Sequence, residues 1–228
     1  MPQQQTTSPD FSGLWIPLVT PFRDGAIDHA ALATLTRRLA ADGVAGFVVC
    51  GSTGEAAALH EGEQLASLDT VLAAASGLPV VMGLSGYHLG KTTAWVRKLS
   101  EQPLAGLLVP APHYIRPSQA GLLEWFLAIA DASAVPVLIY DIPYRTGATL
   151  SRETLLALAA HPRIRGIKDW GGDMARTRAL IADAQPADEG LDLGVLWDNG
   201  AGHIVGPNEA DGVGRGIDRR DGHPATPD

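Results

Sequence analysis

The stretch "VPVLIY", residues 135–140, carries the pattern that decides the fold. It is built of Val, Leu and Ile without alternation of polar and apolar residues, which is typical of a strand buried on both faces. Six further runs share this character: GLWIPLVT (13–20), AGFVVC (45–50), PVVMGL (79–84), AGLLVP (105–110), RIRGIK (163–168) and LDLGVL (191–196). The chain therefore contains seven candidates for buried parallel strands.

Longer amphipathic segments separate these runs and are predicted to be helices. They cover residues 28–41, 61–75, 90–100, 118–132, 151–160 and 173–184, and Asp28, Ser118, Ser151 and Asp173 are candidate N-caps. Repeated strand–helix units imply parallel strands joined by right-handed crossovers. We therefore predict an α/β fold, a (β/α)8 TIM barrel. An open doubly wound sheet is the alternative, but its usual Gly-rich phosphate loop is missing from the first strand–helix turn, VTPFRDGAID (19–28).

The repeating pattern stops after Leu196. Residues 197–228 are rich in Gly, Asp and Pro, and no amphipathic helix can be drawn through them. Because TIM barrels typically have about 250 residues, we expect a barrel that is incomplete or irregular after the seventh strand. The predicted organisation is a disordered tail over 1–12, a barrel domain over 13–196 and an aberrant or truncated C-terminal segment over 197–228. A frameshift or a premature ending in the gene would account for that segment.

Composition excludes several classes of partner. The chain has 25 acidic and 17 basic residues, a formal charge of 17 − 25 = −8, whereas nucleic acids and anionic membranes require a basic face. Cys50 is the single cysteine, so no internal disulfide can form and a reducing compartment is expected. The polar start, MPQQQTTSPD, does not read as a signal peptide, and no apolar run is long enough to span a membrane. We expect a cytoplasmic protein.

Polar side chains follow the predicted strands at the ends where barrel active sites are found. They are Ser52, Thr53 and Glu55 after the second strand, Tyr114 after the fourth, Tyr140 and Arg145 after the fifth, and Lys168 at the end of the sixth. Because the carboxyl ends of parallel strands meet at one rim, these side chains are candidates for a single site.

Lys168 at the end of an apolar strand favours Schiff-base chemistry. A lysine amine attacks a carbonyl only when it is neutral, and apolar surroundings favour the neutral form. Tyr140 is a candidate for moving protons among amine, imine and substrate. Ser52 and Thr53 are candidates for holding a carboxylate, and the planar guanidinium of Arg145 for binding a second one.

Structural explanations compete with these roles, because most strand-end lysines and buried tyrosines serve packing alone. The loop "GSTGE" (51–55) lacks the Gly-Lys-Ser/Thr ending of a nucleotide-binding P-loop. The seven histidines are scattered without the paired spacing of a zinc site. We expect no metal and no cofactor.

Four motifs together resemble the dihydrodipicolinate synthase / N-acetylneuraminate lyase family of pyruvate-dependent class I aldolases. They are GSTGE (51–55), YIRPSQAG (114–121), YDIPYRTG (140–147) and GIKD (166–169), and the resemblance runs from about Gly13 to about Leu196. It implies a (β/α)8 barrel with an extra C-terminal helical part, usually assembled as a tetramer of tight dimers. Within the family, the arginine of "RTG" makes the chain resemble the dihydrodipicolinate synthase branch more closely.

The resemblance implies a role for each matching residue. Lys168 would form the imine with pyruvate, and Tyr140 would donate and accept protons. Ser52 would belong to a proton relay, and Thr53 would help to hold the pyruvate carboxylate. Two further residues match motif positions: Tyr114, the relay tyrosine that reaches into the neighbouring subunit's site, and Arg145, which would receive the carboxylate of aspartate semialdehyde.

The implied activity is therefore that of a 4-hydroxy-tetrahydrodipicolinate synthase, with pyruvate and a small aldehyde acid as partners in a homodimer or homotetramer. Three residues depart from the family pattern: Ser52 stands where threonine is common, Asp141 where asparagine is commoner, and Tyr144 where a small residue is common. Two alternatives stay open. One is another pyruvate-dependent aldolase or dehydratase acting on a sugar acid, and the other is a catalytically impaired, truncated remnant.

Overall fold

The computed structural model describes residues 10–170, 174–184 and 194–197. Its main sheet has seven strands: β1 (Trp15–Pro17), β4 (Gly46–Val49), β5 (Val80–Gly83), β6 (Gly106–Pro110), β7 (Val137–Asp141), β8 (Ile164–Asp169) and β9 (Gly194–Trp197). The helices between them are α1 (His29–Ala41), α2 (Glu61–Ala74), α3 (Leu89–Leu99), α4 (Gln119–Ala132), α5 (Pro143–Thr146), α6 (Arg152–Ala159) and α7 (Met174–Ala184). All seven predicted strands and all six predicted helices are confirmed.

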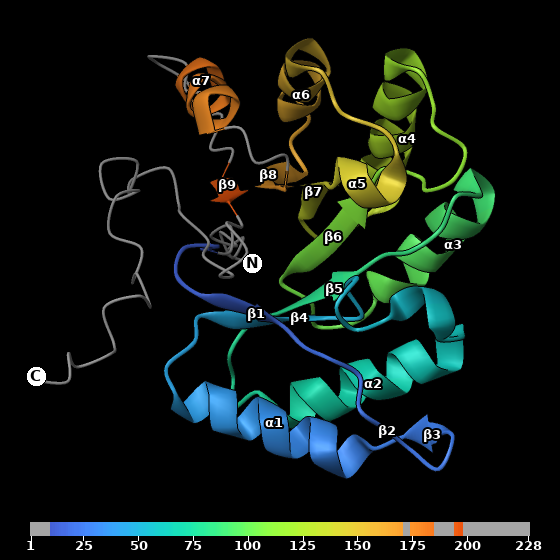
Figure 1. Cartoon of the computed structure of the whole chain (residues 1–228), viewed down its shortest axis with the longest axis vertical. Coiled ribbons are helices and arrows are strands. Elements are labelled where there is room, and N and C mark those ends of the chain that lie inside the picture. Colours follow the sequence, from blue (N-terminus) through green and yellow to red (C-terminus); the bar gives the residue numbers. More distant parts are fainter. Residues whose placement is uncertain (1–9, 171–173, 185–193, 198–228) are drawn as a thin grey trace, which may run out of the picture.

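The order of the strands decides between the two predicted architectures. Each strand of the main sheet pairs in parallel with the next one along the chain, in the order β1-β4-β5-β6-β7-β8-β9. Figure 1 shows the helices arranged around the outside of this curved sheet. A doubly wound sheet would reverse its strand order at an internal switch point. The sheet winds in one direction, as in a TIM barrel, so the predicted fold class is confirmed.

The sheet is open at one side within the part of the chain that is described. There, β1 pairs with β4 and β9 pairs with β8, but no eighth strand joins β9 to β1. This arrangement agrees with the predicted irregularity after the seventh strand. Of the segment 197–228, Trp197 ends β9 and the remainder lies outside the described residues.

The start of the packed structure lies slightly earlier than the sequence predicts. Residues 1–9 of the predicted tail fall outside the described part. Phe11 packs on Trp15 with a distance of 5.5 Å between the ring centroids, and it lies against the apolar cluster inside the sheet. Gly13 is therefore not the first residue that contributes to packing.

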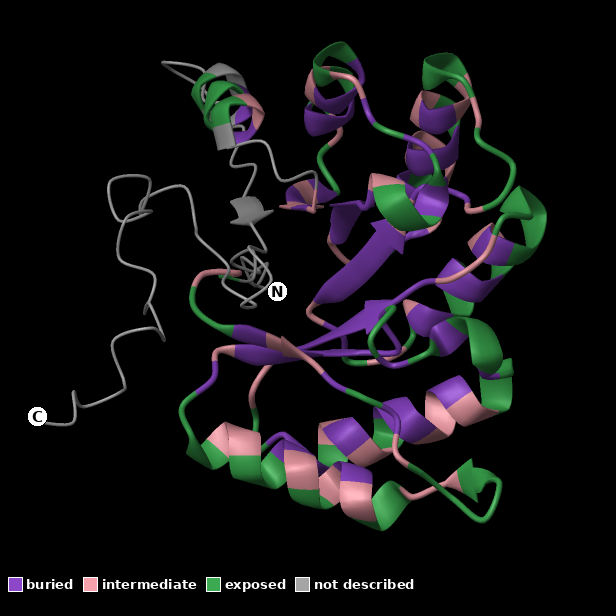
Figure 2. Cartoon of the chain, in the orientation of Figure 1, coloured by how far each residue is buried: buried purple, intermediate pink, exposed green. Residues whose placement is uncertain are grey.

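Two apolar layers cover the two faces of the sheet, and Figure 2 shows its strands as mostly buried. The larger layer lies between the strands and the helices and includes Phe47, Ile139 and Ile167. The smaller layer fills the concave side and consists of Trp15, Val48, Val81, Leu108, Leu138, Tyr140 and Ile142. Successive residues of a strand point to opposite faces, so this division places Tyr140 on the concave side.

Local signals explain most of the helix starts. The side chains of Asp28, Ser118 and Ser151 each accept a hydrogen bond from a backbone N–H of the first turn, at Ala31, Gly121 and Thr154. The fourth predicted cap, Asp173, lies outside the described residues. His60 and His88 also cap helices, through ring nitrogens that accept from Glu63 and Lys91. These two histidines therefore serve the fold.

Three short elements were not predicted: the hairpin β2 (Phe22–Arg23) and β3 (Ala26–Ile27), the 3-10 turn η1 (Ala56–Ala58) and α5. Each is too short to show a periodic pattern. None of the described helices combines the length and the apolar character needed to cross a membrane.

Candidate active site

Tyr140 and Lys168 come together on the concave side, near the carboxyl ends of β7 and β8. They occupy paired positions of the two strands, and their neighbours Asp141 and Asp169 form the next pair. The Lys168 Nζ lies 4.8 Å from the centroid of the Tyr140 ring. Tyr140 is buried, and Lys168 is half-buried. A lysine amine and a phenol thus share one small region, as the strand-end pattern predicted.

Ser52 reaches Tyr140 from the loop that follows β4. Its Oγ lies 3.5 Å from the Tyr140 hydroxyl, at the outer limit of a hydrogen bond. The loop packs closely against the segment after β1. A Cβ at Gly54 would lie only 2.9 Å from the Leu18 carbonyl oxygen, so a larger residue would not fit there without a shift. The Thr20 hydroxyl also donates to the Gly54 carbonyl at 2.7 Å. These contacts hold the loop over the end of the sheet.

Arg145 belongs to the single helical turn α5 that follows β7. Pro143 begins this turn, and Gly147 ends it in the left-handed region with φ +69°, where glycine is favoured. The Arg145 Nε donates a 2.9 Å hydrogen bond to the Tyr144 hydroxyl. The guanidinium carbon lies 5.2 Å from the Tyr144 ring centroid. Tyr144 therefore orients the arginine.

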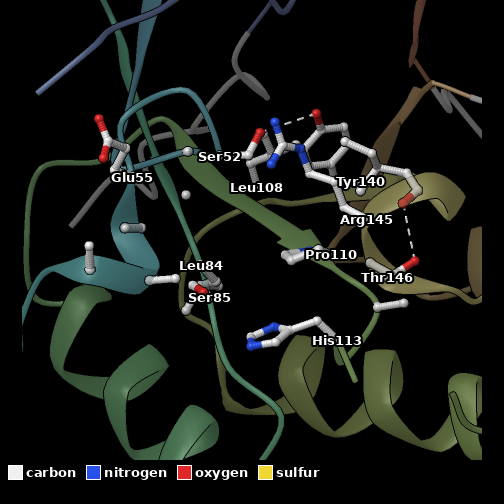
Figure 3. A pocket seen from close by; sticks show the side chains of 17 residues that line it. Ser52, Glu55, Leu84, Ser85, Leu108, Pro110, His113, Tyr140, Arg145 and Thr146 are labelled. Atoms are coloured by element: carbon white, nitrogen blue, oxygen red, sulfur yellow. Dashed lines mark hydrogen bonds between the residues drawn. The ribbon is translucent and has the colours of Figure 1, made fainter. Parts of the chain in front are cut away.

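A cavity of about 410 Å³ lies beside the pair Tyr140 and Lys168, and Tyr140 forms part of its wall. Ser52, Tyr140 and Arg145 all contribute to its wall, and Figure 3 shows them grouped on one side of it, with His113 on the other. Its remaining lining is Gly51, Glu55, Ala56, Ala57, Ala58, Gly83, Leu84, Ser85, Leu108, Pro110, Ala111, Ile142 and Thr146. The cavity therefore offers a cation, hydroxyl groups and an apolar wall to a small acid.

Three predicted site residues are not part of this wall. Lys168 does not line the cavity, although its Nζ lies 4.8 Å from the ring centroid of Tyr140, which does. Thr53 is exposed and is not part of the lining. Tyr114 has φ +77° and is 87% exposed, and it lines a neighbouring depression of about 540 Å³ together with Arg116 and Tyr144. Arg145 lines both hollows. Within one copy of the chain, Tyr114 therefore stands beside the cavity and does not enter it.

His113 and Ser85 are cavity residues that the sequence alone did not identify. His113 is half-buried, and its ring meets Tyr87 edge to face with centroids 5.4 Å apart. Ser85 follows β5, the third predicted strand, after which the sequence analysis identified no site candidate.

A buried charge cluster lies behind the paired strand ends. Asp141 and Asp169 each expose 1% of the side chain, and Arg176 of α7 contacts both. Its Nη2 donates to Asp141 Oδ2 at 2.6 Å and to the Leu150 carbonyl at 2.8 Å, and its Nη1 lies 3.4 Å from Asp169 Oδ1. The Thr177 hydroxyl donates to Asp169 Oδ2 at 2.9 Å. The sequence analysis did not identify this cluster.

Burial and hydrogen bonding have opposite effects on the pKa of Asp141. Burial raises the pKa of Asp141 above its ordinary value of 3.8, while Arg176 acts in the opposite direction. Cys50 shows the effect of burial alone, which raises the pKa of its thiol to about 12. Because the thiolate is the reactive form, Cys50 acts as a small packing residue. Over the described residues, no group of three His, Cys, Asp or Glu side chains is placed to hold a metal ion.

The chain is similar in sequence to a known protein family. The model of the Dihydrodipicolinate synthetase family matches residues 10–189. A 4-hydroxy-tetrahydrodipicolinate synthase from Stenotrophomonas maltophilia is 41% identical over 177 residues, which cover 77% of this chain and 60% of the relative. A protein of the same name from Haloarcula marismortui is 33% identical, with 87% and 67% covered. The chain spans about 60% of the length of the first curated relatives it matches.

Solved structures give the same result. A dihydrodipicolinate synthase of Bacillus anthracis superposes with a TM-score of 0.78 at 30% identity, covering 86% of this chain and 70% of that one. The enzyme from Acinetobacter baumannii, solved in complex with pyruvate, superposes with a TM-score of 0.78 at 28% identity, covering 88% and 71%. Together with the family model that matches residues 10–189, these similarities show that the chain belongs to the dihydrodipicolinate synthetase family.

Proposed function

We propose that the chain is a pyruvate-dependent class I lyase, a 4-hydroxy-tetrahydrodipicolinate synthase of lysine and diaminopimelate biosynthesis. It would condense pyruvate with L-aspartate semialdehyde. The observation that carries the proposal is the pairing of Lys168 with Tyr140 beside the cavity, with Ser52 in reach of the phenol. An amine, a phenol and a hydroxyl are the groups that formation of an imine and proton transfer require.

The proposed reaction proceeds in balanced steps. The neutral Lys168 amine attacks the ketone carbon of pyruvate, and loss of water gives an imine. Loss of a methyl proton turns the imine into an enamine. The enamine carbon forms a bond to the aldehyde carbon of the second substrate, and the aldehyde oxygen takes up a proton and becomes a hydroxyl group. The amino group of the second substrate then attacks the imine carbon, which closes the ring of the product and releases the Lys168 amine. Tyr140 transfers protons in these steps, with Ser52 as its relay partner.

Charge guides the binding of the two acids. Arg145 is the cation of the cavity wall, and it is assigned to the carboxylate of aspartate semialdehyde because a guanidinium binds a carboxylate through two parallel hydrogen bonds. Thr53 is assigned to the pyruvate carboxylate by its place in GSTGE alone. The pyruvate complex of the related Acinetobacter baumannii enzyme supports pyruvate as the first substrate.

The exposed Tyr114 is consistent with a function between subunits. It is 87% exposed next to the cavity, and a tyrosine in this motif is expected to complete the proton relay of a neighbouring copy. We therefore include a homodimer or homotetramer in the proposal.

Trapping of the imine tests the proposed function directly. The protein is incubated with pyruvate, reduced with borohydride and digested, and the adduct is located by mass spectrometry. We expect the adduct on Lys168. The internal controls are Lys91 and Lys98, which lie on α3. An adduct on either of these, or none in a protein that melts cooperatively, would contradict the proposal.

One observation favours a second candidate, an aldolase or dehydratase acting on a sugar acid. Tyr144 is 64% exposed and hydrogen-bonded to Arg145, so it occupies space where the aldehyde would approach. Turnover measured with aspartate semialdehyde and with a panel of sugar acids separates the two activities. Binding of pyruvate without turnover of any partner would instead indicate a catalytically impaired remnant.

A further inference from the structure

We propose that Arg176 is a positioning residue that holds the carboxyl ends of β7 and β8 together, by bridging Asp141 and Asp169, so that Tyr140 and Lys168 face each other. The inference rests on the proposed function for its catalytic consequence. The proposed bridge between the two strands rests only on the contacts of Arg176 with Asp141 and Asp169.

The pairing of the two strands creates an electrostatic problem. Asp141 and Asp169 are direct partners across β7 and β8, one step beyond the pair Tyr140 and Lys168. Two carboxylates on directly paired residues repel each other when both are ionised. Both carboxyl groups expose only 1% of their side chains, so water screens this repulsion little. A cation between the two strand ends is therefore needed.

Arg176 meets this need from the helix side of the sheet. One guanidinium nitrogen contacts Asp141 Oδ2 at 2.6 Å and the other lies 3.4 Å from Asp169 Oδ1. The same side chain donates to the Leu150 carbonyl at 2.8 Å, which ties the bridge to the segment before α6. Only a planar fork with several donors makes these three contacts at once.

The alternation of side chains along a strand links this bridge to the site. Tyr140 belongs to the concave layer, while Ile139 and Ile167 belong to the helix-facing layer. Asp141 contacts α7 and therefore lies on the helix side, directly behind the reacting groups. If the carboxylates pushed the strand ends apart, the backbone would carry Tyr140 away from Lys168.

A double-variant experiment separates this role from simple packing. Arg176→Met removes the cation that contacts both carboxylates. Adding Asp141→Asn removes one negative charge, so the double variant has no repulsion although it still lacks the arginine. A purely structural role of Arg176 predicts that the asparagine rescues nothing. Arg178→Met, an exposed arginine on the same helix, is the matched control.

Two measurements are made on each folded variant. The first is the rate at which pyruvate is trapped on Lys168 by borohydride, and the second is acylation of Lys168 relative to the exposed Lys91 by a small reagent. We expect trapping by Arg176→Met to be about tenfold to a hundredfold slower, since a displacement of about 1 Å can cost that much. Acylation of Lys168 should also fall at least about threefold, because displaced strand ends change the access of the reagent to the amine.

The double variant should recover both rates to within about threefold of the parent, as expected for coupled neighbours. The inference would be overturned if trapping of pyruvate and acylation of Lys168 in Arg176→Met proceeded at the parent rates. It would also be overturned if the double variant were as slow as Arg176→Met. If Arg176→Met does not fold, the comparison is made with Arg176→Lys, which keeps the charge without the fork. If the parent forms no pyruvate adduct, the proposed function fails, and acylation of Lys168 alone decides the positioning role.

Discussion

Single residues at the ends of β7 and β8 carry both the chemistry and its support. Tyr140 and Lys168 face the concave side, and Asp141 and Asp169 directly after them face the helices. Successive side chains of a strand point to opposite faces. Each strand end therefore places one residue among the reacting groups and the next residue in the buried ion cluster. A substitution on either side is expected to affect catalysis, but by different routes.

The first residue-scale prediction concerns the phenol. Tyr140→Phe keeps the ring that packs in the concave layer and removes the hydroxyl that Ser52 approaches. We expect turnover of pyruvate and aspartate semialdehyde to fall about 10²–10⁴-fold, the usual contribution of a positioned proton-transfer group. Melting temperature is the control and should change little. A variant that turns over at the parent rate would show that another group moves the protons.

A second residue-scale prediction follows from the raised pKa of Asp141. Below the ordinary value of 3.8 the carboxyl is neutral in both states of the protein, so parent and Asp141→Asn should be equally stable. As pH rises through the raised pKa, the folded parent must ionise a buried group, and the free energy of unfolding of the parent falls relative to the variant. Asp141→Asn should therefore be more stable than the parent at pH 7.

Urea melts of both proteins between pH 3.5 and pH 8 measure this difference. Arg176 and Asp169 are the charged groups that face Asp141 and are present in both proteins. A variant that is less stable than the parent at pH 7 would mean that the ion pair with Arg176 outweighs the cost of burial.

At the scale of elements, the turn α5 contributes residues to the walls of both hollows. Its four residues follow β7 directly and present Arg145 to both hollows. Arg145→Ala should weaken aspartate semialdehyde by roughly tenfold to a hundredfold, since a hydrogen bond to a charged group contributes about 1.5–3 kcal/mol. Formation of the pyruvate imine should remain intact.

The matched control for this prediction is Arg163→Ala. Arg163 is exposed and precedes β8 at the far end of the sheet, so its removal should leave both substrates unaffected. Equal loss of imine formation in Arg145→Ala would indicate that the arginine binds pyruvate or stabilises the loop.

The elements also show where prediction from sequence reaches its limit. The strands were predictable because each is a short run of branched apolar residues between amphipathic segments. The hairpin β2–β3 was missed although Asp24-Gly25 is a turn signal, because two-residue strands show no periodicity. The ion cluster joins residues up to 35 positions apart, so it depends on how α7 packs and has no local signature.

At the scale of the whole molecule, consecutive strand order brings distant motifs to one rim. Ser52 and Tyr140 are separated by 88 positions and meet at 3.5 Å. The candidate site was therefore predictable in part, because every strand end contributes to the same rim once the barrel class is recognised. The conformation of the exposed Tyr114 loop has no local sequence signal, and only the resemblance implied that Tyr114 points away from the cavity of its own chain.

The final prediction concerns the two edges of the sheet. In the described part of the chain, β1 and β9 each have one strand partner, and a closed barrel would give each a second. A chimera that continues after Trp197 with the corresponding part of the Stenotrophomonas maltophilia relative supplies candidates for that second strand partner. Burial of apolar area stabilises by about 25 cal/mol per Å², so closure should add several kcal/mol.

We expect the chimera to melt about 10 °C or more above the 228-residue chain, because each kcal/mol corresponds to roughly 2–4 °C in a domain of this size. Its pyruvate-dependent turnover should also be higher, since closure fixes the strand ends that hold Tyr140 and Lys168. Thermal melts and turnover of the two proteins, purified side by side, check both expectations. The chimera with Lys168→Ala is the control that assigns turnover to this lysine. Equal melting temperatures and equal turnover would mean that the 228-residue chain closes its own sheet with residues beyond Trp197.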